Sequence, residues 1–268
     1  MPVYTADALI LRTYKLGEAD RIVVFLTKDR GKKRGVAKGA RRARSRFVGA
    51  LEPLTRAGVA YYEREQRDLV RLNYVEAQCS PLAVVGREGQ DAAALGHAEY
   101  FAELIDEWAP EAHADERLYR LGASTIDALA ASAPIAPLAR YFEFWLLRLQ
   151  GVYPSLAACP ACGGPFDGGA VMPPREHHFV CGTCAPGSGG IRVSVPALQF
   201  LRTAATSSPD GLDDARLDPL AARELETAHR RLITVHLEKE LKSARVLREI
   251  ARTPSDMGSG RREEDRTT

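Results

Sequence analysis

The first 78 residues alternate short apolar runs with turn-forming residues, a pattern that predicts β-strands. The most compact run is Arg21-Ile-Val-Val-Phe-Leu26. Similar segments cover residues 3–14, 33–37, 54–63 and 69–76, with turns at 15–20, 29–32 and 64–68. Five short strands at this spacing are typical of a small barrel or sandwich. An OB-type barrel fits the count, although the count does not distinguish it from other small barrels.

Beyond Pro81 the apolar period changes from that of strands to that of helices. Apolar residues recur at helical spacing in segments 91–108, 115–131, 137–150, 196–206 and 217–250, while Gly and Pro interrupt residues 151–190. We therefore predict an α+β protein, with a five-stranded OB-type β-barrel in residues 1–79 and an all-α helical domain in residues 80–252. An insertion at about 155–192 interrupts the helical domain, and the polar tail 253–268 is predicted to be disordered.

Four of the five cysteines form two tight pairs within the predicted insertion. Cys159, Cys162, Cys181 and Cys184 give the spacing C-x2-C-x18-C-x2-C. Each C-x2-C turn places two thiolates on one side of a metal, and two such turns complete the tetrahedron that zinc prefers. The sequence therefore predicts one structural Zn²⁺ in a four-cysteine zinc ribbon. Cys79 stands apart and is interpreted as a small buried apolar residue.

A catalytic zinc is the alternative to a structural one. His97-Ala98-Glu99 resembles the H-x-E part of zinc deaminase signatures. A His97 ligand would leave Cys181 and Cys184 unused, and Ala158 stands where that signature has Pro. Four thiolates also fill the zinc shell, whereas catalytic zinc keeps one position open. We expect no enzymatic activity, with a zinc-dependent nucleic-acid-modifying enzyme as the alternative.

The overall charge of +2 conceals an asymmetry along the chain. Residues 1–78 hold 17 Lys or Arg against nine Asp or Glu, while the rest holds 20 against 26. Such a split predicts a polyanionic partner for the first third only. No run of about 18 uncharged apolar residues occurs and the N-terminus does not resemble a signal peptide. We therefore expect a cytoplasmic protein that does not bind membranes.

Ten cations crowd residues 28–46, opposed only by Asp29. On a barrel loop this density favours contact with a phosphate backbone, while a flexible solubilising loop is the alternative. Phe47, Tyr61, Tyr62 and Tyr74 are candidate platforms for stacked bases, although most of them are expected in the core. No base-reading motif and no P-loop is present, so we expect weak sequence specificity and no ATP hydrolysis.

A second hypothesis makes the helical domain an adaptor for partner proteins. Apolar helices offer grooves, and an acidic peptide would need a cation beside an apolar pocket. The candidate partner-binding cations within helical segments are Arg140, Arg148, Arg202, Lys242 and Arg245.

The chain resembles the RecO family of bacterial recombination mediators over nearly its whole length. The segments that carry the resemblance, in order, are 7–13 (DALILRT), 15–20 (KLGEAD), 27–32 (TKDRGK), 35–42 (GVAKGARR), 51–54 (LEPL), the two Cys pairs and 236–245 (HLEKELKSAR). Each segment is short, but their combination in this order is specific.

This resemblance implies an N-terminal OB domain, a helical C-terminal domain and a zinc ribbon inserted in the latter. It implies binding of single- and double-stranded DNA, annealing of complementary strands without ATP, and help in loading RecA onto single strands. The implied partners are RecR and the C-terminal tail of single-stranded DNA-binding protein. Carried onto this chain, the expected DNA-binding residues are Lys28, Arg30, Lys32, Lys33, Arg34, Lys38, Arg41, Arg42 and Arg44.

Overall fold

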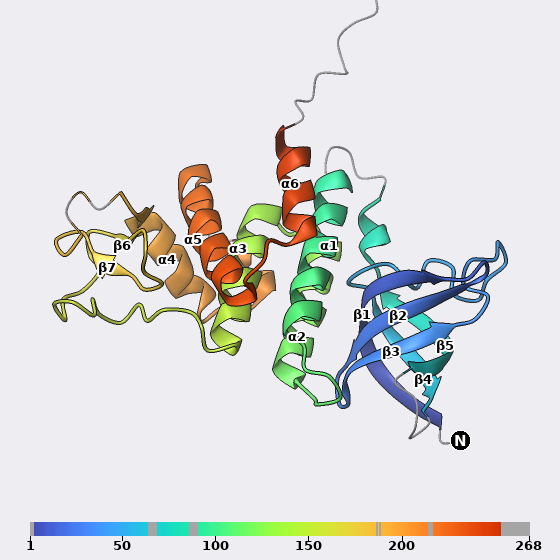
Figure 1. The fold of residues 1–268 in the computed structure, drawn as a ribbon. Coiled ribbons are helices and arrows are strands. Elements are labelled where there is room, and N and C mark those ends of the chain that lie inside the picture. Colours follow the sequence, from blue (N-terminus) through green and yellow to red (C-terminus); the bar gives the residue numbers. More distant parts are fainter. Residues whose placement is uncertain are drawn as a thin grey trace, which may run out of the picture.

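The barrel and helical parts are seen in a computed structural model that describes residues 3–63, 69–85, 91–185, 187, 189–213 and 217–252. The expected turn at 64–68 and the expected tail at 253–268 lie outside these residues. Figure 1 shows the barrel at one end of the molecule, a small sheet at the other and helices between them.

Five strands close into a barrel in the order β1-β2-β3-β5-β4. They are β1 (Val3–Leu16), β2 (Asp20–Thr27), β3 (Gly31–Ala37), β4 (Arg56–Tyr62) and β5 (Leu69–Cys79). The long β1 pairs with β4 through its first half and with β2 through its second, and an irregularity between Ile10 and Arg12 lets it bend from one partner to the other. The parallel pairing of β3 with β5 completes the ring. The predicted barrel is confirmed.

Strand β2 is apolar from Ile22 to Leu26 because both faces of this part of the strand pack against other elements. Val23 and Phe25 point into the barrel core, whereas Val24 and Leu26 belong to the core shared with the helices. Leu9 and Leu11 of β1 lie in that shared core too. The barrel and the helices are therefore joined by a continuous apolar contact.

The described residues form six α-helices and two short 3-10 helices. They are η1 (Pro81–Val84), α1 (Asp91–Trp108), α2 (Glu116–Ala130), α3 (Ile135–Leu149), α4 (Val195–Ala204), η2 (Pro209–Asp213), α5 (Pro219–Leu237) and α6 (Lys242–Arg252). None of the described helices is both long and apolar enough to cross a bilayer. The α+β class predicted from the sequence is confirmed.

One predicted helical segment, 217–250, is in fact two helices. Glu238 adopts a left-handed conformation with φ of 53° and ends α5. Helix α6 then begins where Glu103 of α1 accepts hydrogen bonds from the backbone N–H groups of Lys242 (3.3 Å) and Ser243 (2.8 Å). The break therefore depends on a carboxylate from a distant helix, which apolar periodicity does not reveal.

Close packing between the two parts depends on Gly122 of α2. A Cβ at this position would lie 2.5 Å from Leu9 Cδ1 of the barrel and 2.7 Å from Ile105 Cδ1 of α1. Only glycine lets the three elements approach this closely.

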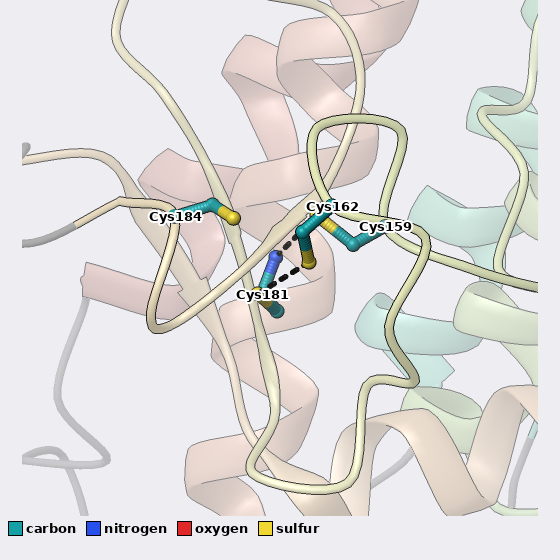
Figure 2. Close-up of side chains that lie close together, drawn as sticks. All are labelled: Cys159, Cys162, Cys181 and Cys184. Carbon is teal, nitrogen blue, oxygen red and sulfur yellow. Dashed lines mark hydrogen bonds between the residues drawn. The ribbon is translucent and has the colours of Figure 1, made fainter.

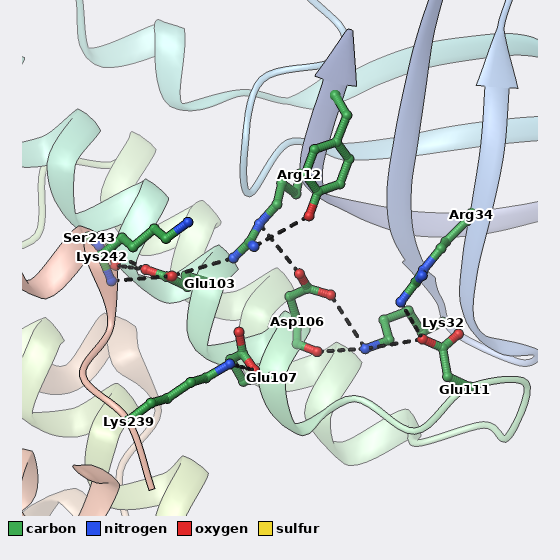
Figure 3. A network of polar contacts seen from close by, with 11 residues as sticks. Arg12, Lys32, Arg34, Glu103, Asp106, Glu107, Glu111, Lys239, Lys242 and Ser243 are labelled. Carbon is green, nitrogen blue, oxygen red and sulfur yellow. Dashed lines mark hydrogen bonds and ion pairs between the residues drawn. The ribbon is translucent and has the colours of Figure 1, made fainter. Parts of the chain in front are cut away.

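A row of acidic side chains on α1 and the loop after it meets basic side chains of the barrel (Figure 3). Arg12 of β1 lies 3.5 Å from Glu103 and 3.4 Å from Asp106. The Lys32 ammonium of β3 donates to the backbone carbonyl of Asp106 at 2.6 Å. Burial opposes ionisation of Glu103, but hydrogen bonds from Ser243 and Lys242 together with Arg12 lower its pKa. We call Arg12, Lys32, Glu103, Asp106 and Glu111 the α1 junction.

The predicted insertion contains a three-stranded antiparallel sheet between α3 and α4. Its strands are β6 (Ala170–Met172), β7 (Val180–Cys181) and β8 (Ile191–Val193), in the order β7-β6-β8. Phe166, Met172 and Phe179 are buried and join the core of the helical part. The small sheet is thus packed onto the helices, which lets it carry the cysteines in a fixed place.

Candidate functional sites

The ten-cation segment is divided between the two ends of β3. Lys28 and Arg30 lie in the turn before β3, and Lys32, Lys33 and Arg34 lie within the strand. Lys38, Arg41, Arg42 and Arg44 follow the strand, in an irregular stretch that leads to β4, and the tenth cation, Arg46, lies over the Phe47 ring there. Arg34 and Lys38, the nearest members of the two sets, are four positions apart, which is roughly 13 Å along an extended chain. The run of charge in the sequence is therefore two separate groups in space.

The first group is largely paired with acids. Lys33 lies 2.7 Å from Glu63, and Arg34 lies 3.1 Å from Glu111. Lys28 lies 3.8 Å from Glu116, while Arg30 stacks over the Tyr4 ring, its guanidinium carbon 4.2 Å from the ring centre.

Lys32 differs from the rest of the group because it is buried. It is only 8% exposed, and its ammonium contacts Asp106 and Glu111 of the α1 junction. Lys32 was expected to contact DNA from the sequence. The structure corrects that expectation by giving it a role in holding the barrel to α1.

The second group projects into solvent. Lys38, Arg41, Arg42 and Arg44 are exposed, and none of them forms an ion pair with a carboxylate of the described residues. Arg41 donates from its backbone N–H to the Ala19 carbonyl at 2.9 Å and from its guanidinium to the Gly17 carbonyl at 2.9 Å. These bonds hold the segment against the β1–β2 turn.

Because the segment after β3 contacts the β1–β2 turn, the second group gains a cation that was not among the DNA-binding residues expected from the sequence. Lys15 is exposed beside the turn that Arg41 contacts. The hydrogen bond from the Gly39 N–H to Asp20 Oδ1, 2.8 Å long, fixes the same approach. We define the basic end of the barrel as the five exposed cations Lys15, Lys38, Arg41, Arg42 and Arg44.

Two of the four candidate stacking aromatics are inside the barrel, and Tyr62 is half-buried. Phe47 is 2% exposed and Tyr61 is fully buried, whereas Tyr74 is 47% exposed on β5. Burial raises the pKa of Tyr61 to about 12. Phe47 and Tyr61 are therefore core residues, and Tyr74 remains accessible to a base.

The four cysteines converge on one point beside the small sheet, whose strand β7 carries Cys181 (Figure 2). Their sulfur atoms all lie within 4.8 Å of one another, and the sulfurs of Cys162 and Cys181 are 3.7 Å apart. A tetrahedral zinc with Zn–S bonds of about 2.3 Å needs sulfur separations of about 3.8 Å. The separations are close to this value, so the cluster can hold a metal ion after small side-chain adjustments.

Local backbone groups prepare part of the cluster for ionisation. The Cys181 N–H donates to Cys159 Sγ at 3.3 Å and lowers the pKa of that thiol to about 6. Contacts with Cys162 and Cys181 instead raise the pKa of Cys184 to about 12. Four thiolates at this distance repel one another, so full ionisation of the set favours a cation at its centre.

The deaminase alternative is not supported by the positions of its residues. His97 lies on α1, where its Nδ1 is 2.7 Å from the Ala93 carbonyl. Among the described residues, the cluster of possible metal ligands formed by the four cysteines includes no histidine.

Cys79, which was expected to be buried, is partly buried, and its sulfur lies 3.8 Å from the Ile126 carbonyl.

Two of the five candidate partner-binding cations lie in one groove. Arg148 of α3 and Arg202 of α4 line a pocket of about 370 Å³ with Phe144, Leu201 and residues 153–157. The guanidinium carbon of Arg148 lies 5.3 Å from the Phe144 ring centre and 5.1 Å from that of Trp145. We call this the Phe144 groove. It joins an apolar floor to two basic side chains.

The other three candidate cations lie elsewhere. Arg140 is 7% exposed and lies 3.0 Å from Glu143 inside the helical core, so a docked partner would not reach it. Lys242 and Arg245 are exposed on α6, which packs against α1. The structure thus places Arg148 and Arg202 together and separates Arg140, Lys242 and Arg245 from them. The apolar residues of the groove carry no sequence signal, because they resemble any buried helix face.

Together these features define a two-part protein, an OB-type barrel with one basic end joined to a helical domain that carries a four-cysteine cluster able to hold a metal ion. Residues 1–80 match the family described as recombination protein O N terminal, and residues 89–245 match recombination protein O C terminal. The chain belongs to the RecO family.

Curated relatives agree with this assignment. The chain is 36% identical over 247 residues to a DNA repair protein RecO of Anaeromyxobacter dehalogenans, covering 90% of this chain and 94% of the relative. It is 34% identical over 248 residues to that of Pelobacter propionicus, covering 91% and 96%. A third, from Koribacter versatilis, is 39% identical over 176 residues, covering 66% and 70%.

Proposed function

We propose that this protein is a non-enzymatic DNA-binding mediator of recombination and DNA repair. The observation that carries the proposal is the basic end of the barrel, where Lys15, Lys38, Arg41, Arg42 and Arg44 are exposed. Arginine forks suit phosphate oxygens, and unpaired surface cations release counterions when phosphates replace them. Membership of the RecO family supports DNA as the polyanion.

Annealing of complementary strands follows from charge neutralisation alone. Two strands repel through their phosphates, and a protein that neutralises several phosphates on each lowers this barrier and raises their local concentration. The reaction needs no ATP. The same contacts serve single and double strands, because the basic end has no base-reading motif. Through RecR, the protein helps load RecA onto single-stranded DNA, and its place of action is the cytoplasm, at the nucleoid.

An annealing assay tests this function directly. Two complementary oligonucleotides carrying a fluorophore and a quencher are mixed with full-length protein, without ATP. We expect fluorescence to fall at a rate that increases with protein and decreases with salt. A rate equal to that of protein-free strands at about 50 mM salt, where phosphate contacts are strong, would reject the proposal.

We further propose that the Phe144 groove binds the acidic, apolar C-terminal tail of single-stranded DNA-binding protein. An aromatic floor flanked by Arg148 and Arg202 matches a peptide whose apolar end is preceded by carboxylates. Calorimetry with a tail peptide tests this. Replacing Arg148 and Arg202 by Ala should weaken binding at least tenfold. The same change at Lys242 and Arg245, which lie outside the groove on α6, should leave it unaltered, and equal losses in both variants would contradict a groove-specific site.

We propose that the cysteine cluster holds one structural Zn²⁺. The sulfur separations support this, and four thiolates leave no open position for a reacting water. Metal analysis of freshly purified protein should give one zinc per chain. A zinc-dependent nucleic-acid-modifying activity would instead appear as turnover that chelators abolish, which a nuclease and deaminase assay on single strands would detect.

A further inference from the structure

One wall of the Phe144 groove is a short strap, residues 153–158, that joins α3 to the cysteine cluster. Residues 153–157 all line the groove. In the described part of the chain, no backbone–backbone hydrogen bond involves residues 154–158; the Ala157 N–H donates to the Ser155 hydroxyl at 3.3 Å. Leu156 packs against the core. The position of this wall therefore depends chiefly on how the two ends of the strap are held.

The first end is held by a buried polar network. The Tyr153 hydroxyl lies 3.1 Å from His229 Nε2, and His229 Nδ1 lies 2.9 Å from Glu143. Glu143 also accepts a hydrogen bond from Tyr100 at 2.9 Å and pairs with Arg140 at 3.0 Å. Glu143 and His229 are almost fully buried, so each polar atom needs its partner. This network fixes the hydroxyl end of Tyr153.

The ring of Tyr153 forms part of the groove itself. It makes an edge-to-face contact with the Phe144 ring, with ring centres 4.8 Å apart and planes at 85°. The Tyr153 N–H donates to the Leu147 carbonyl at 3.1 Å, which ties the strap to the end of α3. The first end of the strap is therefore held by backbone, ring and hydroxyl together.

The second end is held by the cysteine cluster. Cys159 follows the strap directly and is 1% exposed, with its N–H donating to the Gly164 carbonyl at 2.8 Å. Its sulfur accepts from the Cys181 N–H, and Phe179, two residues before Cys181, packs on Tyr153 with ring centres 6.3 Å apart. Each thiolate–metal bond would tie this end to the chain around Cys181 and Cys184.

We propose that the cysteine cluster, with its metal bound, is the tether that keeps the strap in place as a wall of the partner groove. The metal would then control peptide binding from outside the groove, with no contact between the metal and the peptide. Releasing one end returns backbone freedom to residues 154–158, and a peptide must then order them again on binding. The inference rests on the proposed function of the groove.

The test compares full-length protein with and without its metal, removed by chelation and restored by one equivalent of Zn²⁺. The probe is a fluorescent peptide with the tail sequence of single-stranded DNA-binding protein, followed by anisotropy. We expect metal removal to weaken peptide binding at least tenfold and to accelerate amide exchange at Ala157 of the strap and at Cys159, whose N–H groups are hydrogen-bonded to the Ser155 hydroxyl and the Gly164 carbonyl. Binding of a single-stranded oligonucleotide by the barrel should change less than twofold.

Unchanged peptide affinity together with unchanged exchange in the strap would overturn the tether. Loss of helical circular dichroism on chelation would overturn it too, because the effect would then be global. If the metal-loaded protein does not bind the peptide at all, the proposed groove function fails, while the exchange measurement still decides whether the cluster holds the strap.

A variant that leaves every cysteine intact tests the other end of the strap. Tyr153→Phe removes the hydroxyl bonded to His229, and Tyr141→Phe is the matched control, since the Tyr141 hydroxyl donates to the Ser207 carbonyl at 3.2 Å. We expect Tyr153→Phe to weaken peptide binding by roughly twofold to tenfold, the range of a single hydrogen bond. Tyr141→Phe should have no effect. Equal affinities for the two variants would argue against a positioned strap.

Discussion

The basic end of the barrel makes a quantitative prediction about salt. Replacing Arg41, Arg42 and Arg44 with Ala removes three of its five exposed cations. If each cation contacts one phosphate, log K for single-stranded DNA should fall with log salt at a slope of about −3.5 for the wild type and about −1.4 for the variant. Between about 50 and 200 mM salt, affinity should then fall about 130-fold for the wild type and about sevenfold for the variant.

The chain offers a matched control at the other end of β3. Lys28, Lys33 and Arg34 are also three cations, but they lie 3.8, 2.7 and 3.1 Å from the carboxylates of Glu116, Glu63 and Glu111. Phosphates would have to displace these carboxylates, so fewer counterions are released. Replacing the three by Ala should change the slope by less than about one.

Fluorescence anisotropy with a labelled oligonucleotide at five salt concentrations measures both slopes. Circular dichroism and thermal unfolding establish that the variants are folded. An equal loss of slope in the two triple variants would refute the prediction, because exposure and pairing would then not decide which cations meet DNA. A wild-type slope in the Arg41, Arg42 and Arg44 variant would refute it as well.

Three further predictions concern stability. The buried Tyr61 hydroxyl has no hydrogen-bond partner in the described part of the structure. Tyr61→Phe should therefore leave the free energy of unfolding in urea unchanged or raise it by up to about 1 kcal/mol. A decrease of more than about 2 kcal/mol would contradict this. Cys159→Ser should abolish stoichiometric zinc and lower the melting temperature, as metal analysis and calorimetry would show; full zinc content would contradict the cluster. Burial lowers the pKa of His229 in the folded protein, so on acidification this histidine is protonated in the unfolded chain before it is protonated in the folded one. The free energy of unfolding should therefore fall as the pH drops below about 6.5, and His229 alone contributes at most about 1.4 kcal/mol per pH unit. Because the pKa of His97 is also lowered, His229→Gln should flatten but not abolish the pH dependence of thermal unfolding between about pH 7 and pH 5, and an unaltered slope would refute the assignment.

Much of the fold could be predicted because its signals are local. The run 22–26 is apolar at every position, and β2 is indeed buried there by the barrel core on one side and the helices on the other. The segment 91–108 shows helical spacing over its whole length and coincides with α1. Where the signal was not local, prediction failed. The single helix expected at 217–250 is interrupted at Glu238, where α5 ends, and the first turn of α6 is capped by the carboxylate of Glu103 from α1.

The same limit explains the candidate sites. The cysteine cluster was predictable because metal geometry restricts the spacing of its ligands, and its four sulfurs do converge. The basic segment was predictable only as a count of charges. The acids that neutralise Lys32 and Arg34 come from residues 106 and 111, more than 70 positions later, and no periodicity in the sequence connects them. The burial of the Arg140–Glu143 ion pair could not be predicted either, because two residues spaced i,i+3 on a helix can face either water or the core.

The α1 junction changes what the charge asymmetry of the chain means. Part of the basic surplus in the first third neutralises acids of the helical part, so the cations left for a polyanion gather at the far end of β3. The Phe144 groove is formed by α3, α4 and the strap, and α4 and the small sheet lie at the end of the molecule remote from the barrel (Figure 1). DNA and a peptide would therefore occupy separate surfaces of one molecule. The proposed mediator function uses this arrangement, because the protein would hold the tail of single-stranded DNA-binding protein in the groove while its barrel contacts the exposed phosphates.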